Sequence, residues 1–69
     1  MSQLKPGDLA WLPSRTALLS FDKTGKDVQQ WCYPHTPNYV LIIGEPNDVY
    51  FEILYRGDRW SVPKDKLYE

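Results

Sequence analysis

The stretch VYFEILYRGDRWSV, residues 49–62, decides the fold of this chain. Apolar and polar residues alternate on both sides of Gly57-Asp58. A period of two is typical of a strand with one buried face, and Gly-Asp is a common two-residue turn between paired strands. The stretch therefore predicts a β-hairpin with its turn at Gly57-Asp58 and with Tyr55 opposite Trp60. The side chains expected on the inner face are Val49, Phe51, Ile53, Tyr55, Trp60 and Val62.

The same turn contains Arg56-Gly57-Asp58, a tripeptide that cell-adhesion ligands present to their receptors. The hairpin explains Gly57 and Asp58 without a receptor, and chance matches to three residues are frequent. The first residues show no cationic start followed by an apolar run, so we expect no signal peptide. We interpret the tripeptide as a turn, with Arg56 opposite Arg59 on the outer face.

A second turn is expected at EPND, residues 45–48, because Pro46 has the φ angle that the early position of such a turn requires. A four-residue loop there pairs Gly44 with Val49 and Ile42 with Phe51. Two turns thus predict one three-stranded antiparallel meander over residues 38–63.

The two ends of the chain complete the expected core. KPGDLAWLP, residues 5–13, predicts a turn followed by a strand in which Leu9 and Trp11 point the same way, and Pro13 ends that strand. Near the other end, Pro63 is expected to open a single helical turn that places Leu67 against the core. Six prolines leave little room for a long helix, so the class is all-β.

Composition narrows the possibilities further. The 69 residues make a single domain, 1–69, in which 14–37 is a long irregular loop or hairpin. Cys32 is the only cysteine, which excludes an intrachain disulfide and favours a reducing compartment. A net charge of −1 argues against nonspecific nucleic-acid binding. The longest apolar run, YVLII at 39–43, is far shorter than a membrane-spanning helix of roughly 20 residues.

Two surfaces are candidates for binding a partner. The first lies on the outer face of the meander, where a contiguous apolar patch indicates an interface unless 14–37 covers it. Its predicted members are Tyr39, Leu41, Ile43, Tyr50 and Leu54. The second is the proline-containing segment 31–39, where Trp31, Tyr33 and His35 are expected anchors for a protein partner. Alternatively, these aromatic residues cap an open end of the barrel, stack on bases, or surround a methylated amine.

We find no combination of residues that indicates catalysis or metal binding. Cys32 and His35 are two ligands where a structural zinc site needs four, and no third group accompanies them as a nucleophile and base. The cations Arg56, Arg59, Lys64 and Lys66 are mixed with acidic residues, which is typical of a solvated face. We therefore expect neither an enzyme nor a cofactor, a metal or a small-molecule substrate.

The order of these elements resembles a known barrel family. The segments that carry the resemblance are GDLAW at 7–11, YVLIIGE at 39–45, VYFEILYRG at 49–57 and RWSVPKDKL at 59–67. They are similar to small SH3-like barrel proteins encoded by tailed bacteriophages, particularly marine ones, over about two thirds of the chain. The resemblance implies a barrel of about five strands with a long N-terminal excursion and a closing single-turn 3-10 helix.

Proteins of this family are mostly of unassigned function, so the expected function comes from the two candidate surfaces: a noncatalytic protein-interaction module. The resemblance adds the expectation that this module serves a phage as an accessory or assembly protein, in the host cytoplasm or the virion. Fold alone does not decide function, because the KOW and Tudor types of this barrel share the plan. The alternative is a nucleic-acid-binding barrel that uses Trp31, Tyr33, Arg56 and Arg59.

Overall fold

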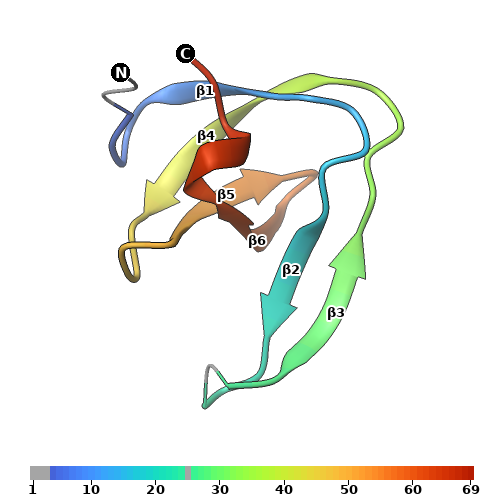
Figure 1. Cartoon of the computed structure of the whole chain (residues 1–69), viewed down its shortest axis with the longest axis vertical. Helices are drawn as coiled ribbons and strands as arrows, with labels where there is room; N and C mark the ends of the chain where they lie inside the picture. Colours follow the sequence, from blue (N-terminus) through green and yellow to red (C-terminus); the bar gives the residue numbers. More distant parts are fainter. Residues whose placement is uncertain (1–3, 25) are drawn as a thin grey trace.

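The computed structural model describes residues 4–24 and 26–69, in which six antiparallel strands form one unclosed sheet (Figure 1). The elements are β1 (Leu9–Leu12), β2 (Leu18–Phe21), β3 (Val28–Cys32), β4 (Asn38–Gly44), β5 (Tyr50–Tyr55), β6 (Asp58–Pro63) and the 3-10 turn η1 (Lys64–Lys66). The order across the sheet is β1-β4-β5-β6-β2-β3. The predicted all-β class is confirmed. The structure has six strands where about five were predicted, and β2 and β3 both lie within the expected excursion.

The hairpin of β5 and β6 turns one residue earlier than the sequence predicts. Tyr55 lies opposite Asp58, so the turn residues are Arg56 and Gly57, with φ angles of 52° and 81°. Two successive positive φ angles define the type I′ turn, which favours Gly at its second position. The predicted pairing of Tyr55 with Trp60 is therefore wrong by two residues.

The predicted pairing of Arg56 with Arg59 is also wrong, because Arg59 lies opposite Leu54. The buried face of the hairpin is nevertheless largely as predicted: Phe51, Ile53, Tyr55 and Val62 are buried. A shift of two residues returns each side chain to the same face, since the side-chain period of a strand is two.

Gly57 gives a direct test of this turn. Gly57→Ala is expected to lower the free energy of unfolding by about 1–2 kcal/mol, because only the positive φ is unfavourable for alanine. A Cβ atom at this position meets no atom within 4 Å. The control is Gly44→Ala, whose Cβ makes an ordinary contact of 3.6 Å with the Glu52 Cβ and whose φ is not left-handed. Equal losses for the two variants in urea denaturation would contradict the type I′ turn.

The loop between β4 and β5 is longer than predicted. Ile42 pairs with Ile53 rather than with Phe51, and the register shifts between Ile42 and Gly44. The Asn47 side chain accepts hydrogen bonds from the backbone N–H groups of Val49 and Tyr50, at 2.8 and 2.9 Å. These bonds keep Val49 in the loop, where it is 60% exposed instead of lying on the inner face.

The N-terminal turn and strand agree with the sequence. The backbone N–H of Asp8 donates to the carbonyl of Lys5, and Gly7 has a φ of 97°. Strand β1 then ends at Leu12, directly before Pro13. Leu9 and Trp11 share a side as predicted, and the structure shows that it is the outer side.

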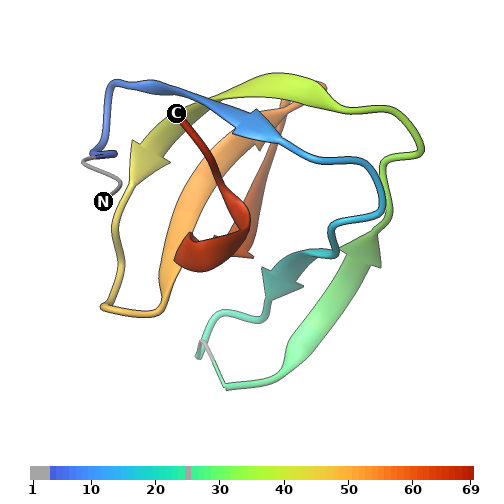
Figure 2. The ribbon, with the colours of Figure 1, turned by 45° about the horizontal axis from the view of Figure 1, so that its top comes forward.

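The C-terminal segment packs back onto the start of the chain (Figure 2). After η1, Leu67 is buried, and the backbone groups of Trp11 and Tyr68 exchange two hydrogen bonds of 2.6 and 3.0 Å. The predicted helical turn and the burial of Leu67 are both confirmed. The core consists of Ala10, Leu12, Leu18, Val40, Ile42, Phe51, Ile53, Tyr55, Val62 and Leu67.

Residues 14–37 contain the hairpin of β2 and β3. It joins the rest of the sheet through the pair Leu19 and Ser61, and Leu18 anchors it in the core. At its tip, the Asp22 carboxylate accepts hydrogen bonds from the hydroxyl and the backbone N–H of Thr24, at 2.6 and 3.0 Å. The hydrogen bond from the Thr24 hydroxyl is the main reason why the pKa of Asp22 lies below its ordinary value of 3.8. Gly25, part of the predicted turn, lies outside the described residues.

Candidate interaction surfaces

Apolar side chains cover the outer side of three neighbouring strands. Leu9 on β1 lies opposite Leu41 on β4, which lies opposite Leu54 on β5. These side chains are 65%, 37% and 41% exposed. In the next row, the rings of Trp11 and Tyr39 meet edge to face, with centroids 5.0 Å apart. We call these five residues the outer apolar face.

The alternation of β1, β4 and β5 explains how this face arises. Their inner residues, Ala10, Val40, Ile42 and Ile53, are buried, so the residues between them must point outward. An antiparallel sheet with one solvated face normally carries polar residues there. A contiguous apolar surface at this position is typical of an interaction site.

The predicted outer cluster is only partly assembled. Tyr39, Leu41 and Leu54 lie together, whereas Ile43 is half-buried at the irregular end of β4. Tyr50, at the other end of β5 from Leu54, packs edge to face against Phe21, with centroids 5.5 Å apart. The β2–β3 hairpin thus shields Tyr50 and leaves the other three exposed.

Sequence reasoning missed that Leu9 and Trp11 belong to the same face. The available signal was the common direction of Leu9 and Trp11 within LAWL, residues 9–12. The sequence did not show that β1 pairs with β4. This pairing places Leu9 beside Leu41 and Trp11 beside Tyr39. This pairing joins positions about thirty residues apart and follows from the tertiary fold.

The second predicted surface lies on β3 and the segment after it. Trp31 is 72% exposed, and Tyr33 and His35 are also exposed. This exposure is inconsistent with the alternative in which Trp31 and Tyr33 cap an open end of the barrel. The residues between these exposed side chains point inward: Cys32 packs against the core, and Pro34 is buried. The carbonyl of Pro34 accepts a hydrogen bond of 2.8 Å from the backbone N–H of Arg15.

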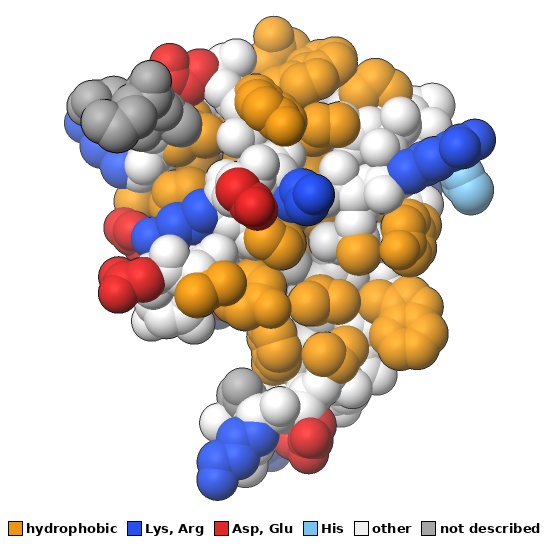
Figure 3. All heavy atoms as spheres, in the orientation of Figure 1, with side chains coloured by type: hydrophobic (Ala, Val, Ile, Leu, Met, Phe, Trp, Pro, Cys, Tyr) orange, Lys and Arg blue, Asp and Glu red, His pale blue; other side chains and the backbone are white. Residues whose placement is uncertain are grey.

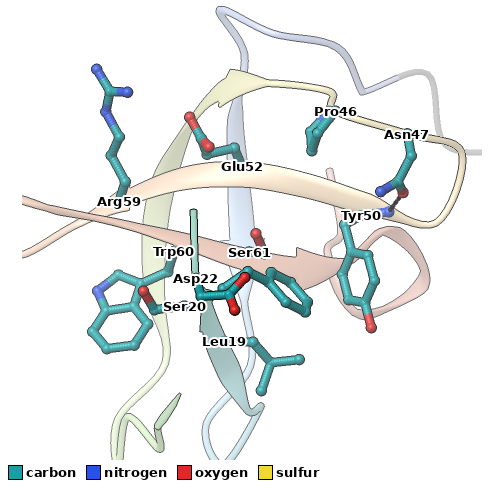
Figure 4. A pocket seen from close by; sticks show the side chains of 11 residues that line it. Leu19, Ser20, Asp22, Pro46, Asn47, Tyr50, Glu52, Arg59, Trp60 and Ser61 are labelled. Atoms are coloured by element: carbon teal, nitrogen blue, oxygen red, sulfur yellow. Dashed lines mark hydrogen bonds between the residues drawn. The ribbon is translucent and has the colours of Figure 1, made fainter. Parts of the chain in front are cut away.

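A cavity of about 390 Å³ is bounded by β2, β5, β6 and the loop before β5 (Figure 4). It is lined by Leu19, Ser20, Phe21, Asp22, Pro46, Asn47, Tyr50, Glu52, Arg59, Trp60 and Ser61. No sequence signal pointed to this cavity, because its walls come from segments that only the folded sheet brings together. Its lining mixes aromatic rings with charges of both signs.

The groups in this cavity do not form a recognisable catalytic arrangement. Asp22 and Glu52 are its acidic residues and Arg59 its basic one, and in Figure 4 the Arg59 side chain extends away from the aromatic residues. His35, the single histidine of the sequence, is not among the lining residues. Within residues 4–24 and 26–69, no group of three or more His, Cys, Asp or Glu side chains is placed to hold a metal ion.

The four cations Arg56, Arg59, Lys64 and Lys66 lie on β6 or near its two ends. Arg56 and Lys64 flank the two ends of β6, a separation of about 20 Å at roughly 3.3 Å per residue. The Arg56 guanidinium lies 5.4 Å from the centre of the Tyr55 ring, and Lys64 forms an ion pair with Glu45. These contacts are local: Arg56 lies over an aromatic ring, and Lys64 is paired with an acidic side chain.

Comparisons with known proteins add no further constraint: no family model, curated protein or solved structure significantly matches the chain. The part of the chain that the structure describes also contains no helix long and apolar enough to cross a membrane.

Proposed function

We propose that this protein is a noncatalytic protein-interaction module built on an SH3-like barrel plan. The order of elements supports the barrel: a first strand, a hairpin excursion, a three-stranded meander, a 3-10 turn, and the return of Tyr68 to β1. The observation that carries the function is the outer apolar face. Five apolar side chains lie together on the side of β1, β4 and β5 that faces away from the core.

The composition of this face is suited to recognising another protein. Aromatic residues such as Trp11 and Tyr39 are frequent energetic centres of interfaces. Leu9, Leu41 and Leu54 would supply the surrounding apolar area, since burial of apolar surface contributes about 25 cal/mol per Å². The surface lies on paired strands, so little conformational entropy is lost when a partner binds.

The biological setting that we propose rests on the sequence resemblance. In that setting the module is an accessory or assembly protein of a tailed bacteriophage, in the host cytoplasm or the virion. The exposed second surface, formed by Trp31, Tyr33 and His35, is compatible with a module that joins two partners.

The proposed function can be tested by affinity capture with matched baits. The double variant Leu41→Ser, Leu54→Ser is expected to lose the partner that the wild-type bait retains from infected-cell extract. Val49→Ser is the control, because Val49 is exposed and apolar but lies in the loop before β5, outside the outer apolar face. Retention of every captured protein by the double variant would contradict the proposal.

The double variant must be shown to fold, so its circular dichroism spectrum and urea midpoint are compared with those of the wild type. Because both leucines are more than one third exposed, we expect each substitution to lower the free energy of unfolding by less than about 1 kcal/mol. If the double variant unfolds, Tyr39→Lys replaces it, since Tyr39 is 67% exposed.

The nucleic-acid alternative is tested separately with a labelled single-stranded oligonucleotide at low salt. Binding that weakens steeply with salt and depends on Trp31, Tyr33, Arg56 and Arg59 would favour that function. If, in addition, the double variant Leu41→Ser, Leu54→Ser retains every protein that the wild-type bait captures, the protein-interaction proposal is overturned.

A further inference from the structure

The two edges of the sheet differ in how they are protected. At one edge, β1 pairs with β4 on its inner side and exchanges two hydrogen bonds with Tyr68 on its other side. At the opposite edge, β3 pairs with β2, and no other described strand lies beyond it. Figures 1 and 2 both show β3 on the outside of the molecule. An unpaired edge presents backbone donors and acceptors that can pair with another strand.

The sequence of β3 lacks the usual protection against such pairing. Exposed edges are commonly blocked by charged side chains or proline, whereas β3 reads VQQWC and contains neither. The register shift in the β2–β3 ladder falls at Gln29, toward the start of β3, and leaves Gln30, Trp31 and Cys32 in regular pairing. In Figure 3, hydrophobic side chains gather along the hairpin, and charged side chains lie at its tip.

We propose that β3 pairs antiparallel with β3 of a second copy of this chain, about a two-fold axis at Trp31, to form a dimer with one continuous sheet. The inference rests on the proposed interaction role and names the partner of the second surface, which is distinct from the outer apolar face.

The register follows from self-complementarity. With the axis at Trp31, this residue lies opposite Trp31 of the second copy, and Gln30 lies opposite its Cys32. A two-fold interface places the same patch on both subunits, so a charged strand would meet its own charge. The uncharged β3 has no such repulsion, and this favours a second copy as the occupant of the edge.

The position of Trp31 gives the pairing a specific apolar contact. Trp31 is the most exposed of the large hydrophobic residues of the structure, at 72%, and it lies directly opposite Leu19. In the dimer, each Trp31 has Leu19 on one side and the Trp31 of the second copy on the other. Directly opposed aromatic residues on paired strands stabilise the pairing.

The test is sedimentation velocity of the full chain over a range of concentrations. We expect the wild type to dimerise reversibly and Trp31→Lys to raise the dissociation constant at least about tenfold, because a lysine would then face a lysine. Tyr39→Lys is the matched control: it places the same charge on a comparably exposed aromatic position of β4 and should leave the dimer intact.

Hydrogen exchange distinguishes strand pairing from a contact between side chains alone. Amides in Gln30–Cys32 that point away from β2 should exchange more slowly at concentrations where the dimer forms, and not in Trp31→Lys. If Trp31→Lys does not reproduce the wild-type circular dichroism spectrum, Trp31→Gln takes its place.

A monomer at all concentrations would overturn the inference and leave the proposed function, with a foreign partner, unaffected. A dimer that Tyr39→Lys disrupts and Trp31→Lys does not would also overturn it, but would support the outer apolar face as a self-association surface. The two proposals can therefore fail independently.

Discussion

Replacement of Ile53 by alanine is expected to reduce the free energy of unfolding by about 2–5 kcal/mol. Ile53 is fully buried at the middle of β5, opposite Ile42 on one side and Trp60 on the other. Alanine removes apolar contacts and leaves a cavity between strands that cannot close without breaking their pairing. At roughly 0.05–0.15 kcal/mol per residue, a domain of this size has about 3–10 kcal/mol of stability in total. The variant is therefore expected to lose a large fraction of the total stability.

The matched control for this prediction is the next residue, Leu54→Ala. Leu54 has the same backbone environment in β5 but points to the outer face, so its loss should remain below about 1 kcal/mol. Urea denaturation followed by tryptophan fluorescence measures both variants. Similar losses for Ile53 and Leu54 would mean that the two faces of β5 are not the buried and exposed faces described above.

The second large effect is expected at the C-terminal end of the chain. Leu67→Ala should also lower the free energy of unfolding by about 2–5 kcal/mol, because Leu67 is nearly fully buried in the core. Its side chain holds the segment after η1 against the sheet, where the Tyr68 backbone pairs with Trp11. Loss of the side chain therefore also weakens the protection of the β1 edge.

Lys66→Ala is the control for Leu67→Ala, because Lys66 belongs to the same 3-10 turn and is exposed. Its effect should lie within about 0.5 kcal/mol. Hydrogen exchange of the Tyr68 amide gives a second readout, which should be faster in Leu67→Ala alone. A neutral Leu67→Ala variant would show that the C-terminal segment does not fold cooperatively with the sheet.

Much of the fold could be predicted from the sequence because the side-chain period of a strand tolerates errors in register. The predicted turn at Gly57-Asp58 gave pairings that were wrong by two residues, and the turn at 45–48 gave the same error for Ile42. Beyond the register shift, Gly44 lies opposite Glu52, three residues from the predicted Val49. The buried positions Phe51, Ile53 and Val62 were nevertheless correct, since a shift of two restores each residue to its face. Similarly, Pro63 and Leu67 were local signals sufficient for the closing 3-10 turn.

The errors arose where a nonlocal or side-chain interaction overrides a local rule. The Asn47 side chain accepts hydrogen bonds from two backbone N–H groups, and these bonds keep Val49 out of β5. The alternation of apolar and polar residues gives no sign of these bonds. The packing of Phe21 on Tyr50 depends on where the hairpin of β2 and β3 joins the sheet. The cavity beside this contact could not be predicted from the sequence for the same reason.

The sequence by itself determined the all-β class and the alternation that sorts residues into inner and outer faces. These features depend on residues close together in the chain, where period and turn chemistry act directly. Only the tertiary structure decided which outward residues meet: it placed Leu9 and Trp11 beside Leu41 and Tyr39, and left the edge of β3 unpaired. The order of the strands depends on which apolar faces pack against one another, and this packing involves residues from the whole chain.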